Sequence, residues 1–347
     1  MKKNTTILII TLILILIAGL LYFSRRSGTF SDKDKDFAVK DTASVTKVFL
    51  ADKKNRTILL ERQDAGSWKL NGTYPARQSG VEMLLETMKN LVPKYPVPRN
   101  AHDNIISQMA SQSVKVEVYQ MVYRVDLFDR IRLFPHEKLT KTYYVGSATA
   151  DNMGTFMLME GADIPFVVHL LGFRGYVAPR YSTLERDWRD HSVFRTKLYD
   201  IREVVMEIPR EPENSFKVLN GEDEITLLRL SDNQPMPFDT LKMLNFLTAF
   251  TDLRYESLLD EFDTALKDSI ISSPPRNILT LVDKEGNETA ITAFYKANFD
   301  NTVDPEGKPY PYDVDRLYAL VNDKRDFVLI QYYVFDKVLR PLSYFEP

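Results

Sequence analysis

One apolar pattern occurs twice in this sequence and constrains the fold more than any other feature. Apolar residues stand at positions i, i+3, i+4, i+7 and i+10 from Val81 to Leu91, and the same spacing returns from Met243 to Leu253. This is the period of an α-helix that buries one face. Short β-branched and aliphatic runs flank both helices in the same order, which predicts strands, a helix and more strands, twice.

Four pairs of positions connect the two halves at a nearly constant interval, which indicates an internal duplication. Hairpin-length connections favour antiparallel sheets, so we expect an α+β fold. It would consist of two duplicated, mainly antiparallel sheet-plus-helix units, 44–190 and 191–347, each with one helix packed on a face. The pairs are Val48 with Val205, Val81 with Met243, Phe166 with Phe327 and Pro179 with Pro341.

The N-terminus predicts a membrane anchor. Residues 7–23 carry no charge and are mostly Ile and Leu, with basic residues on both sides. A helix of this length is near the short limit for a bilayer core roughly 30 Å thick. A cleaved signal peptide is the alternative, but no small-residue cleavage site follows. We expect residues 1–26 to be a transmembrane signal-anchor that contacts the lipid bilayer through 7–23, and residues 27–43 to be a polar linker.

Charge and composition exclude several classes of function. The 347-residue chain has a net charge of −3, and because Lys2, Lys3, Arg25 and Arg26 contribute +4, the remainder carries −7. An acidic body argues against a nucleic-acid partner. The chain has no cysteine, so disulfides, thiolate metal sites and cysteine nucleophiles are excluded. An anchor so close to the N-terminus predicts a single-pass protein of the bacterial inner (cytoplasmic) membrane with an extracytoplasmic, periplasmic body.

Two charged segments are candidates for chemistry. The segment 184–194 places Asp187, Asp190 and His191 around Trp188, which fits either an acid–base site or a connector between the halves, and its position favours the connector. The acidic loop from Asp300 to Asp315 offers oxygen ligands for Ca²⁺, but its spacing favours a polar insertion. The four histidines form no metal-binding pair, and no nucleophile elbow or phosphate loop occurs. We assign no catalytic, cofactor-binding or metal-ligating residue.

The order of these segments resembles a known family. The anchored N-terminus, Trp68 after the second strand, the Leu-rich helix and a glycine-bounded hairpin from Gly146 to Gly154 are similar to the bacterial domain of unknown function 4340 (DUF4340). The resemblance runs from about Val45 to the C-terminus. It implies an extracytoplasmic, membrane-tethered protein, and some members accompany or fuse to gliding-type ABC-transporter components. It implies no catalytic residue.

These observations predict a protein that acts through contacts with an envelope protein partner, in association with an ABC transporter or another envelope assembly, without catalysis. Two alternatives remain open at this point. One is an envelope hydrolase with a carboxylate or metal site, around Asp187, Asp190 and His191 or in the loop from Asp300 to Asp315. The other is a solute-binding module between the two lobes.

Overall fold

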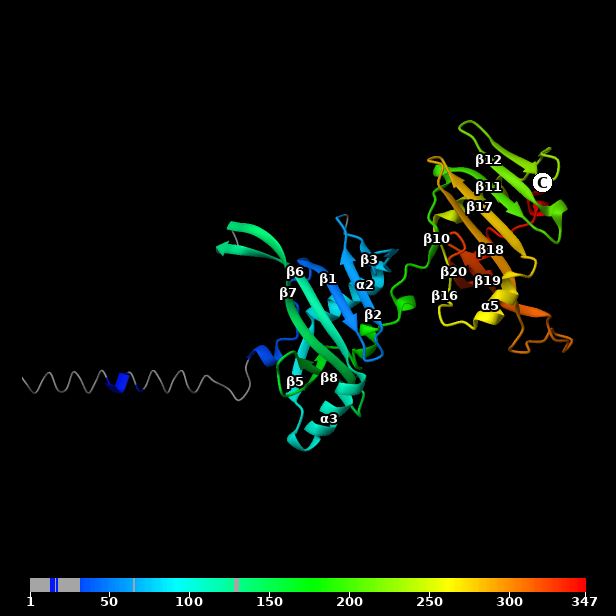
Figure 1. Ribbon diagram of the computed structural model, residues 1–347. Coiled ribbons are helices and arrows are strands. Elements are labelled where there is room, and N and C mark those ends of the chain that lie inside the picture. The colour runs from blue at the N-terminus through cyan, green and yellow to red at the C-terminus, as the bar shows by residue number, and fades with distance from the viewer. Residues whose placement is uncertain (1–12, 16, 18–31, 65, 128–130) are drawn as a thin grey trace, which may run out of the picture. The chain divides into compact units, whose positions relative to one another are not determined.

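The computed structural model describes residues 13–15, 17, 32–64, 66–127 and 131–347 (Figure 1). These residues form an α+β protein with two large antiparallel sheets, which confirms the predicted α+β class and the antiparallel sheets. The chain divides into two compact units, Met1–Asp190 (unit 1) and His191–Pro347 (unit 2). The predicted signal-anchor of residues 1–26 lies outside the described residues, apart from 13–15 and 17. Within the described part, no helix has the length and apolar character needed to cross a membrane.

Unit 1 is built on one nine-stranded sheet. Its strands are β1 (Val45–Ala51), β2 (Thr57–Arg62), β3 (Trp68–Leu70), β4 (Tyr74–Pro75), β5 (Leu91–Pro96), β6 (Val114–Leu127), β7 (Ile131–Ala148), β8 (Thr155–Met159) and β9 (Phe166–Leu170). Their spatial order is β4-β3-β2-β1-β6-β7-β8-β9-β5. Strand β5 contains Pro93 and Pro96, and it lies at an edge of the sheet, where a missing backbone donor is tolerated.

Helix α2 (Gln78–Lys89) covers one face of this sheet. The predicted apolar stripe is confirmed, because all five of its residues are buried in the main core of the unit, the last of them at the start of β5. A short 3₁₀ turn, η2 (Ala178–Tyr181), packs against α2 and closes the core. The Tyr181 hydroxyl lies 3.3 Å from that of Tyr143, so both buried hydroxyls have a hydrogen-bond partner.

A second helix, α3 (Arg99–Gln112), packs on the opposite face, so the expectation of one helix per unit is wrong. Pro98 directly precedes α3, where its fixed φ suits the start of a helix. Only Ile105 and Met109 of α3 are buried, against Tyr144 and Phe156 of the sheet. Two buried residues in fourteen give too weak a helical period for detection in the sequence.

Unit 2 repeats this architecture. Its sheet consists of β11 (Ile201–Glu207), β12 (Phe216–Asn220), β13 (Ile225–Arg229), β14 (Pro235–Met236), β16 (Ser257–Leu258), β17 (Asn277–Asp283), β18 (Glu288–Ala297), β19 (Tyr312–Val321) and β20 (Asp326–Gln331). The spatial order, β14-β13-β12-β11-β17-β18-β19-β20-β16, is that of unit 1 strand for strand. Two further short strands, β10 (Ser192–Phe194) and β15 (Leu253–Arg254), pair with each other.

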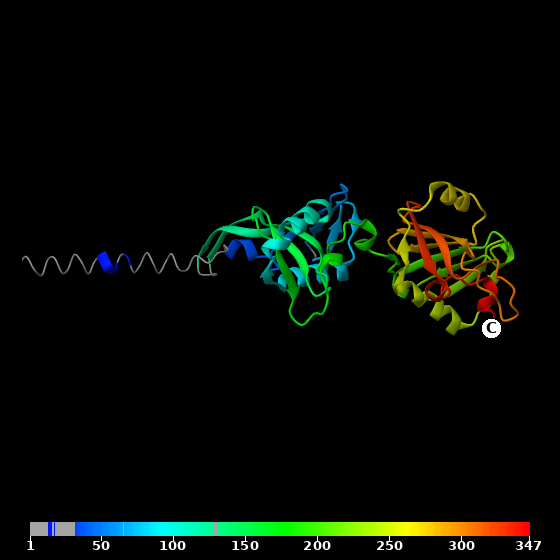
Figure 2. The same ribbon diagram turned by 90° about the horizontal axis from the view of Figure 1, so that it is seen from below.

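Helices α4 (Thr240–Thr248) and α5 (Thr264–Ile271) lie on opposite faces of this sheet (Figure 2). The stripe of α4 is buried in the main core and continues through the 3₁₀ turn η6 (Ala249–Thr251) to Leu253. Ile270 and Ile271 of α5 pack on the other face against Phe294 and Tyr318. The chain ends with a short helix, α6 (Tyr332–Phe335), and a 3₁₀ turn, η7 (Leu342–Phe345), which contacts α4.

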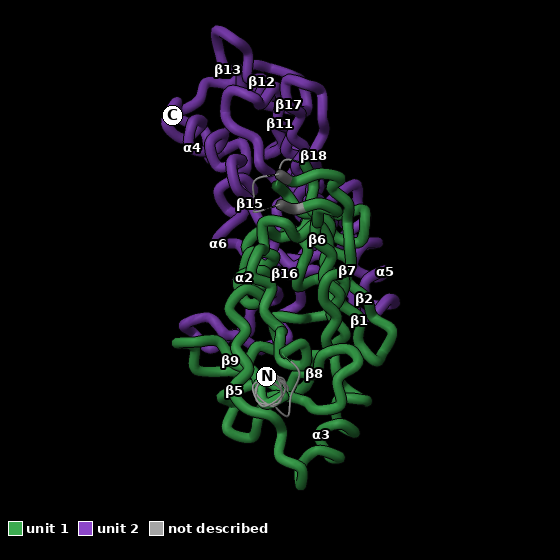
Figure 3. Tube along the Cα trace, turned by 90° about the vertical axis from the view of Figure 1, so that its left-hand side faces the viewer, with its two compact units in different colours: residues 1–190 green, residues 191–347 purple. Residues whose placement is uncertain are grey.

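The strand registers relate the two units residue by residue (Figure 3 shows the units in two colours). The β1–β6 ladder shifts between Val45 and Lys47, and the β11–β17 ladder shifts between Ile201 and Glu203. Both irregularities therefore occur at equivalent positions, near the start of the equivalent strand. A β-bulge is a specific local feature that bends a strand, so its recurrence fixes the correspondence of the two units.

This register moves two of the predicted correspondences to a neighbouring residue. A shift to the next residue turns a side chain to the other face of a sheet, so burial decides between neighbours. The first residue of each corrected pair lies in the core under α2, and the second lies in the core under α4. The corrected pairs are Val48 with Val204 instead of Val205, and Phe166 with Val328 instead of Phe327.

The predicted polar linker of residues 27–43 is wrong for its second half. Phe37 and Val39 are buried in the main core of unit 1. The backbone N–H of Val39 donates to the carbonyl of Met88 at the end of α2, at 2.9 Å. Charged neighbours on both sides hid this short apolar alternation in the sequence, so unit 1 begins earlier than residue 44.

The same entry segment occurs in unit 2. Phe194 is buried in the main core there, and the backbone N–H of Thr196 donates to the carbonyl of Phe250 at 3.0 Å. Phe194 thus has the place of Phe37, and the hydrogen bond to Phe250 has the place of the one to Met88. The two units are therefore equivalent from their entry segments to their closing 3₁₀ turns.

Candidate functional site in unit 1

A cleft lined by both polar and apolar residues lies where α2 ends, β5 begins and β9 ends. Its volume is about 550 Å³. Leu91 at the start of β5 pairs with Leu170 at the end of β9, so the floor of the cleft is the edge of the sheet. The last turn of α2 forms one wall, and the turn that follows β9 forms another.

The turn after β9 presents apolar side chains beside the cleft. Gly172 has φ +77°, a conformation that glycine adopts without steric cost, and it reverses the chain directly after the strand. Leu171 is 74% exposed and Phe173 is 40% exposed, and both line the cleft. Exposed apolar residues that gather on a concave surface are typical of a contact site.

Arg180 is held in place at this cleft, which Glu86 and Lys89 of α2 also line. Its Nη1 donates to the hydroxyl of Thr87 at 2.8 Å, and its guanidinium lies 4.7 Å from the centre of the Phe173 ring. Thr87 is fully buried, and its hydroxyl donates in turn to the carbonyl of Met83. Helix α2 therefore fixes the Thr87 hydroxyl and, through it, the Arg180 guanidinium. A guanidinium is a donor suited to a carboxylate or a carbonyl oxygen.

Unit 2 covers the equivalent place with its own chain. At the interval that separates Val81 from Met243, Leu171 and Phe173 correspond to Tyr333 and Phe335 of α6. Helix α6 contacts β15 and β20, and Phe335 is completely buried in the main core. Unit 1 has a glycine-containing turn here instead of a helix, and the cleft results. In the sequence, only the constant interval between the repeats could have pointed to this turn, because it aligns Phe173 with Phe335.

The candidate residues of the charged segment are divided between the two units. Asp187 belongs to unit 1 and accepts a hydrogen bond from the hydroxyl of Ser182. His191 belongs to unit 2, where its ring stacks on Tyr255 with centroids 4.5 Å apart. Asp190 is the last residue of unit 1. The arrangement agrees with the interpretation of this segment as a connector.

Trp188 and Arg189 explain how the connector is fixed to unit 1. The indole N–H of Trp188 donates to the carbonyl of Ser182 at 2.8 Å, and the ring lies in the main core. The side chain of Arg189 is only 5% exposed, with its guanidinium 3.3 Å from the centre of the Tyr74 ring. Arg189 is therefore a buried charge of the connector, packed against unit 1.

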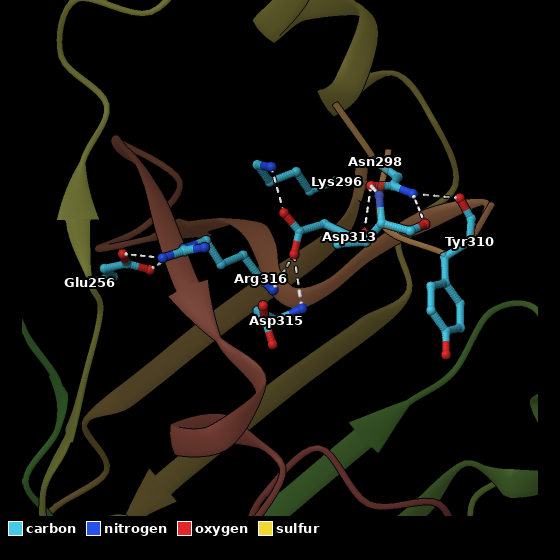
Figure 4. Close-up of polar contacts among 8 residues, drawn as sticks. Glu256, Lys296, Asn298, Tyr310, Asp313, Asp315 and Arg316 are labelled. Carbon is cyan, nitrogen blue, oxygen red and sulfur yellow. Dashed lines mark hydrogen bonds and ion pairs between the residues drawn. The ribbon is translucent and has the colours of Figure 1, made fainter. Parts of the chain in front are cut away.

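The acidic loop that precedes β19 is closed by its own side chains. The Asn298 amide donates to the carbonyls of Thr302 and Tyr310, at 2.8 and 3.0 Å, and its oxygen accepts from Thr302 (Figure 4). The carboxylate of Asp304 accepts from the backbone N–H groups of Glu306 and Lys308. These carboxylate and amide oxygens stabilise turns, as such groups commonly do in loops.

Asp313 is the most buried carboxylate of this region, and its oxygens hold the start of β19. One oxygen accepts from Lys296 Nζ at 2.6 Å, and the other accepts from the backbone N–H groups of Asp315 and Arg316 (Figure 4). Burial alone would raise the pKa of Asp313, but the hydrogen bonds, that from Lys296 above all, outweigh burial and lower this pKa. Arg316 in turn pairs with Glu256 at 2.8 Å.

Metal chemistry finds no support in this loop. Across the described parts of the chain, no group of three or more His, Asp or Glu side chains is arranged to hold a metal ion. The side chain of Asp313 is engaged by an ammonium and by two backbone donors, and Asp304 is engaged within its own turn. These residues form a network of ion pairs and turn-stabilising hydrogen bonds.

The glycine-bounded hairpin from Gly146 to Gly154 is a packed turn. Asn152 has φ +56°, and Asp151 accepts from the backbone of Met153, as expected for turn residues. A Cβ added to Gly154 would lie 2.6 Å from a methyl carbon of Val167. Close approach of β9 therefore explains this glycine.

Comparison with known proteins completes the description. A family model described as "Domain of unknown function (DUF4340)" matches residues 68–274, which is more than half of the chain. The match begins in β3 of unit 1 and ends just after α5 of unit 2, so it crosses the boundary between the units and is shorter than the resemblance seen in the sequence. No curated protein and no solved structure matches the chain.

Proposed function

The chain belongs to the DUF4340 family, and from this premise we propose that it is a membrane-anchored protein of the bacterial envelope that acts by binding another protein. Residues 7–23 anchor it in the inner membrane, and its two units lie on the extracytoplasmic side. The uncharged anchor sequence and its position at the N-terminus support this arrangement. The proposed partner is a membrane component of an ABC transporter or of a related envelope assembly, as the family resemblance suggests.

The proposal includes an origin of the body by duplication of one unit. What supports it is the identical strand order, the bulge at equivalent positions, and the entry segments that hydrogen-bond equivalently to the helices. Two copies of one unit are free to diverge, since either can keep the original contacts. The cleft of unit 1, which unit 2 fills with α6, is such a divergence.

The cleft is the observation that carries the proposal. It joins exposed Leu171 and Phe173 to the fixed guanidinium of Arg180, and protein contact sites combine an apolar centre with an Arg or aromatic anchor in this way. The occupant that fits is a short helical segment of the partner, because unit 2 places such a segment in the equivalent position. An aromatic side chain of that segment would take the place that Phe335 has in unit 2.

Site-specific photo-crosslinking in living cells tests this proposal. A photoreactive residue replaces Leu171, and in a matched control it replaces the equivalent Tyr333 of unit 2. We expect a discrete adduct with an envelope protein from position 171 only. A second substitution, Phe173→Ala, should reduce the adduct at least tenfold, as removal of an aromatic anchor from a contact site commonly does.

The intrinsic fluorescence of Trp68 and Trp188 reports whether unit 1 of each variant remains folded, because both tryptophans are buried in its core. An adduct from position 171 that Phe173→Ala leaves unchanged would contradict the proposal. The absence of any adduct from this position in cells that contain the full chain would contradict it as well.

A further inference from the structure

Unit 1 has a long hairpin that unit 2 lacks. Strands β6 and β7 contain 14 and 18 residues, whereas their counterparts β17 and β18 contain 7 and 10. The additional residues, 119–127 and 131–140, form an arm that extends beyond the sheet (Figure 1). A shift of register between Val118 and Tyr119 marks the base of the arm.

One face of the arm is apolar. In an antiparallel pair, residues opposite each other share a face and alternate residues change face. Tyr119 is opposite Leu139, Tyr123 is opposite Pro135, and Val125 is opposite Leu133, so these residues lie on one face. Met121 lies on the same face opposite Glu137, whose carboxylate pairs with Lys47 and is the one charged group among these partners. Five residues of this face, Met121, Tyr123, Val125, Leu133 and Leu139, are 36–47% exposed. The other face carries Gln120 opposite Lys138, and Val122 opposite His136. By alternation it also carries Phe134, which is 66% exposed.

The chain enters unit 1 beside the base of this arm. Lys141 Nζ lies 2.6 Å from both the carbonyl and the carboxylate of Asp36. The amide of Gln120 donates to the carbonyl of Asp41 and to the hydroxyl of Ser44, at 2.9 and 2.8 Å. The entry segment is therefore attached to the two strands at the point where the arm leaves the sheet.

This attachment limits the distance between the arm and the anchor. The expected anchor ends at residue 26, and the segment from 27 to 36 spans at most about 35 Å when fully extended. The part of β6 that belongs to the arm spans about 30 Å. The arm is thus comparable in length to this greatest distance. The 3₁₀ turn η1 (Asp32–Lys35) shortens the segment below its full extension, so the arm can return to the surface of the bilayer from which the chain emerges.

The side chains of the arm suit a membrane interface. Arg132 lies over the Tyr123 ring at 5.6 Å, and aromatic and basic side chains are enriched where bilayer meets water. Arg124, Arg132 and Lys138 exceed the arm's acidic residues Asp126 and Glu137 by one charge, in a body that is otherwise acidic. An arm with this net charge is attracted to anionic lipid headgroups, and its apolar face buries side chains among them.

We propose that the apolar face of the β6–β7 arm inserts into the headgroup region of the bilayer that anchors the chain, and so holds unit 1 at the membrane surface. This inference depends on the membrane anchor of the proposed function. In this arrangement the arm contacts lipid, and the cleft remains free to bind the protein partner.

Fluorescence of the reconstituted full chain tests the inference. The natural sequence has no cysteine, so Leu133→Cys, Lys138→Cys and Tyr333→Cys each provide one labelling position. An environment-sensitive fluorophore on each variant is measured in vesicles of phosphatidylcholine and phosphatidylglycerol that contain spin-labelled lipids. We expect a blue-shifted emission and at least twofold quenching at position 133. Positions 138, on the polar face, and 333, in unit 2, should show neither.

The outcomes separate this inference from the proposed function. If the chain floats with the vesicles but the probe at position 133 behaves like the two controls, the inference is wrong and the anchor remains. If the chain does not float with vesicles at all, the anchor is wrong and both proposals fail. Equal quenching at 133 and 138 would also contradict the inference, because it would show no preference for the apolar face.

Discussion

Asp52 shows how a single carboxylate joins distant parts of unit 1. It lies in the turn between β1 and β2, with 10% of its side chain exposed. It accepts from the hydroxyl of Thr183 at 2.7 Å and from Arg56 Nε at 2.8 Å, so it attaches the segment before the connector to the first hairpin. Burial alone would raise the pKa of Asp52, but the hydrogen bonds from Thr183 and Arg56 outweigh burial and lower this pKa to about 2.

This carboxylate predicts a pH dependence of stability. Since the pKa is lower in the folded chain than its ordinary value of 3.8, the unfolded chain binds the proton first as the pH falls. The stabilisation is present above pH 4 and is lost as the pH approaches 2. Asp52→Asn should flatten the pH dependence of the unfolding free energy in this window, by on the order of 2 kcal/mol. Urea unfolding of the full chain in detergent, followed by tryptophan fluorescence, measures it.

The control for this prediction is Asp64→Asn, which removes an exposed carboxylate from the next turn of the same unit. An equal loss of pH dependence in both variants would show that Asp52 is not its source. At residue level, the sequence reveals which side chains are charged but not which are buried. Asp52 and Asp313 carry no sequence signal, because their donors Thr183 and Lys296 come from other elements of the fold.

At the level of elements, α4 depends on a cap that α2 lacks. The carboxylate of Asp239 accepts from the backbone N–H of Lys242 at 2.9 Å, whereas Arg77 at the equivalent end of α2 provides no side-chain cap. A capping carboxylate satisfies a backbone donor in the first turn and interacts favourably with the helix dipole.

Removing this cap should weaken unit 2 selectively. We expect Asp239→Ala to lower the unfolding free energy of unit 2 by about 1 kcal/mol. Far-UV circular dichroism follows the loss of structure in both units, while Trp68 and Trp188 report unit 1 alone, since unit 2 contains no tryptophan. The dichroism midpoint should fall while the fluorescence midpoint stays unchanged. Glu222→Ala, at an exposed site of the same unit, is the control, and an equal effect there would refute the role of the cap.

Elements with a complete apolar stripe were predictable from the sequence, and elements without one were not. Helices α2 and α4 follow from five apolar residues at helical spacing, all of which are buried. Helix α3 buries only two residues. In the part of β7 that belongs to the arm, Pro135 and several charged residues interrupt the apolar pattern. The alternation of Met121, Tyr123 and Val125 on β6 was the available signal for the arm. It could not show that these side chains are exposed, because exposure depends on the absence of a neighbouring layer.

For the molecule as a whole, repetition explains the architecture and divergence explains the candidate sites. The two units have the same strand order, but only unit 1 has the long arm, and only unit 2 covers the end of its sheet with α6. The nearly constant sequence interval between the halves revealed that the unit is repeated. It did not show which residue of one unit corresponds to which residue of the other, because the strands are only weakly similar and can be aligned one residue out of step. The sites lie where the repeats differ, so the pattern that predicted the fold could not predict them.

The proposed function places the two-unit body outside the cytoplasm, held there by a membrane anchor. Its most direct test is the labelling of Tyr333→Cys, a position that is 87% exposed in a chain without other cysteines, by a membrane-impermeant maleimide. Spheroplasts with an intact inner membrane are compared with lysed ones. We expect equal labelling before and after lysis. The labelled protein should also remain with the membrane after alkaline extraction. Labelling that appears only after lysis would place the body in the cytoplasm and contradict the proposed extracytoplasmic location.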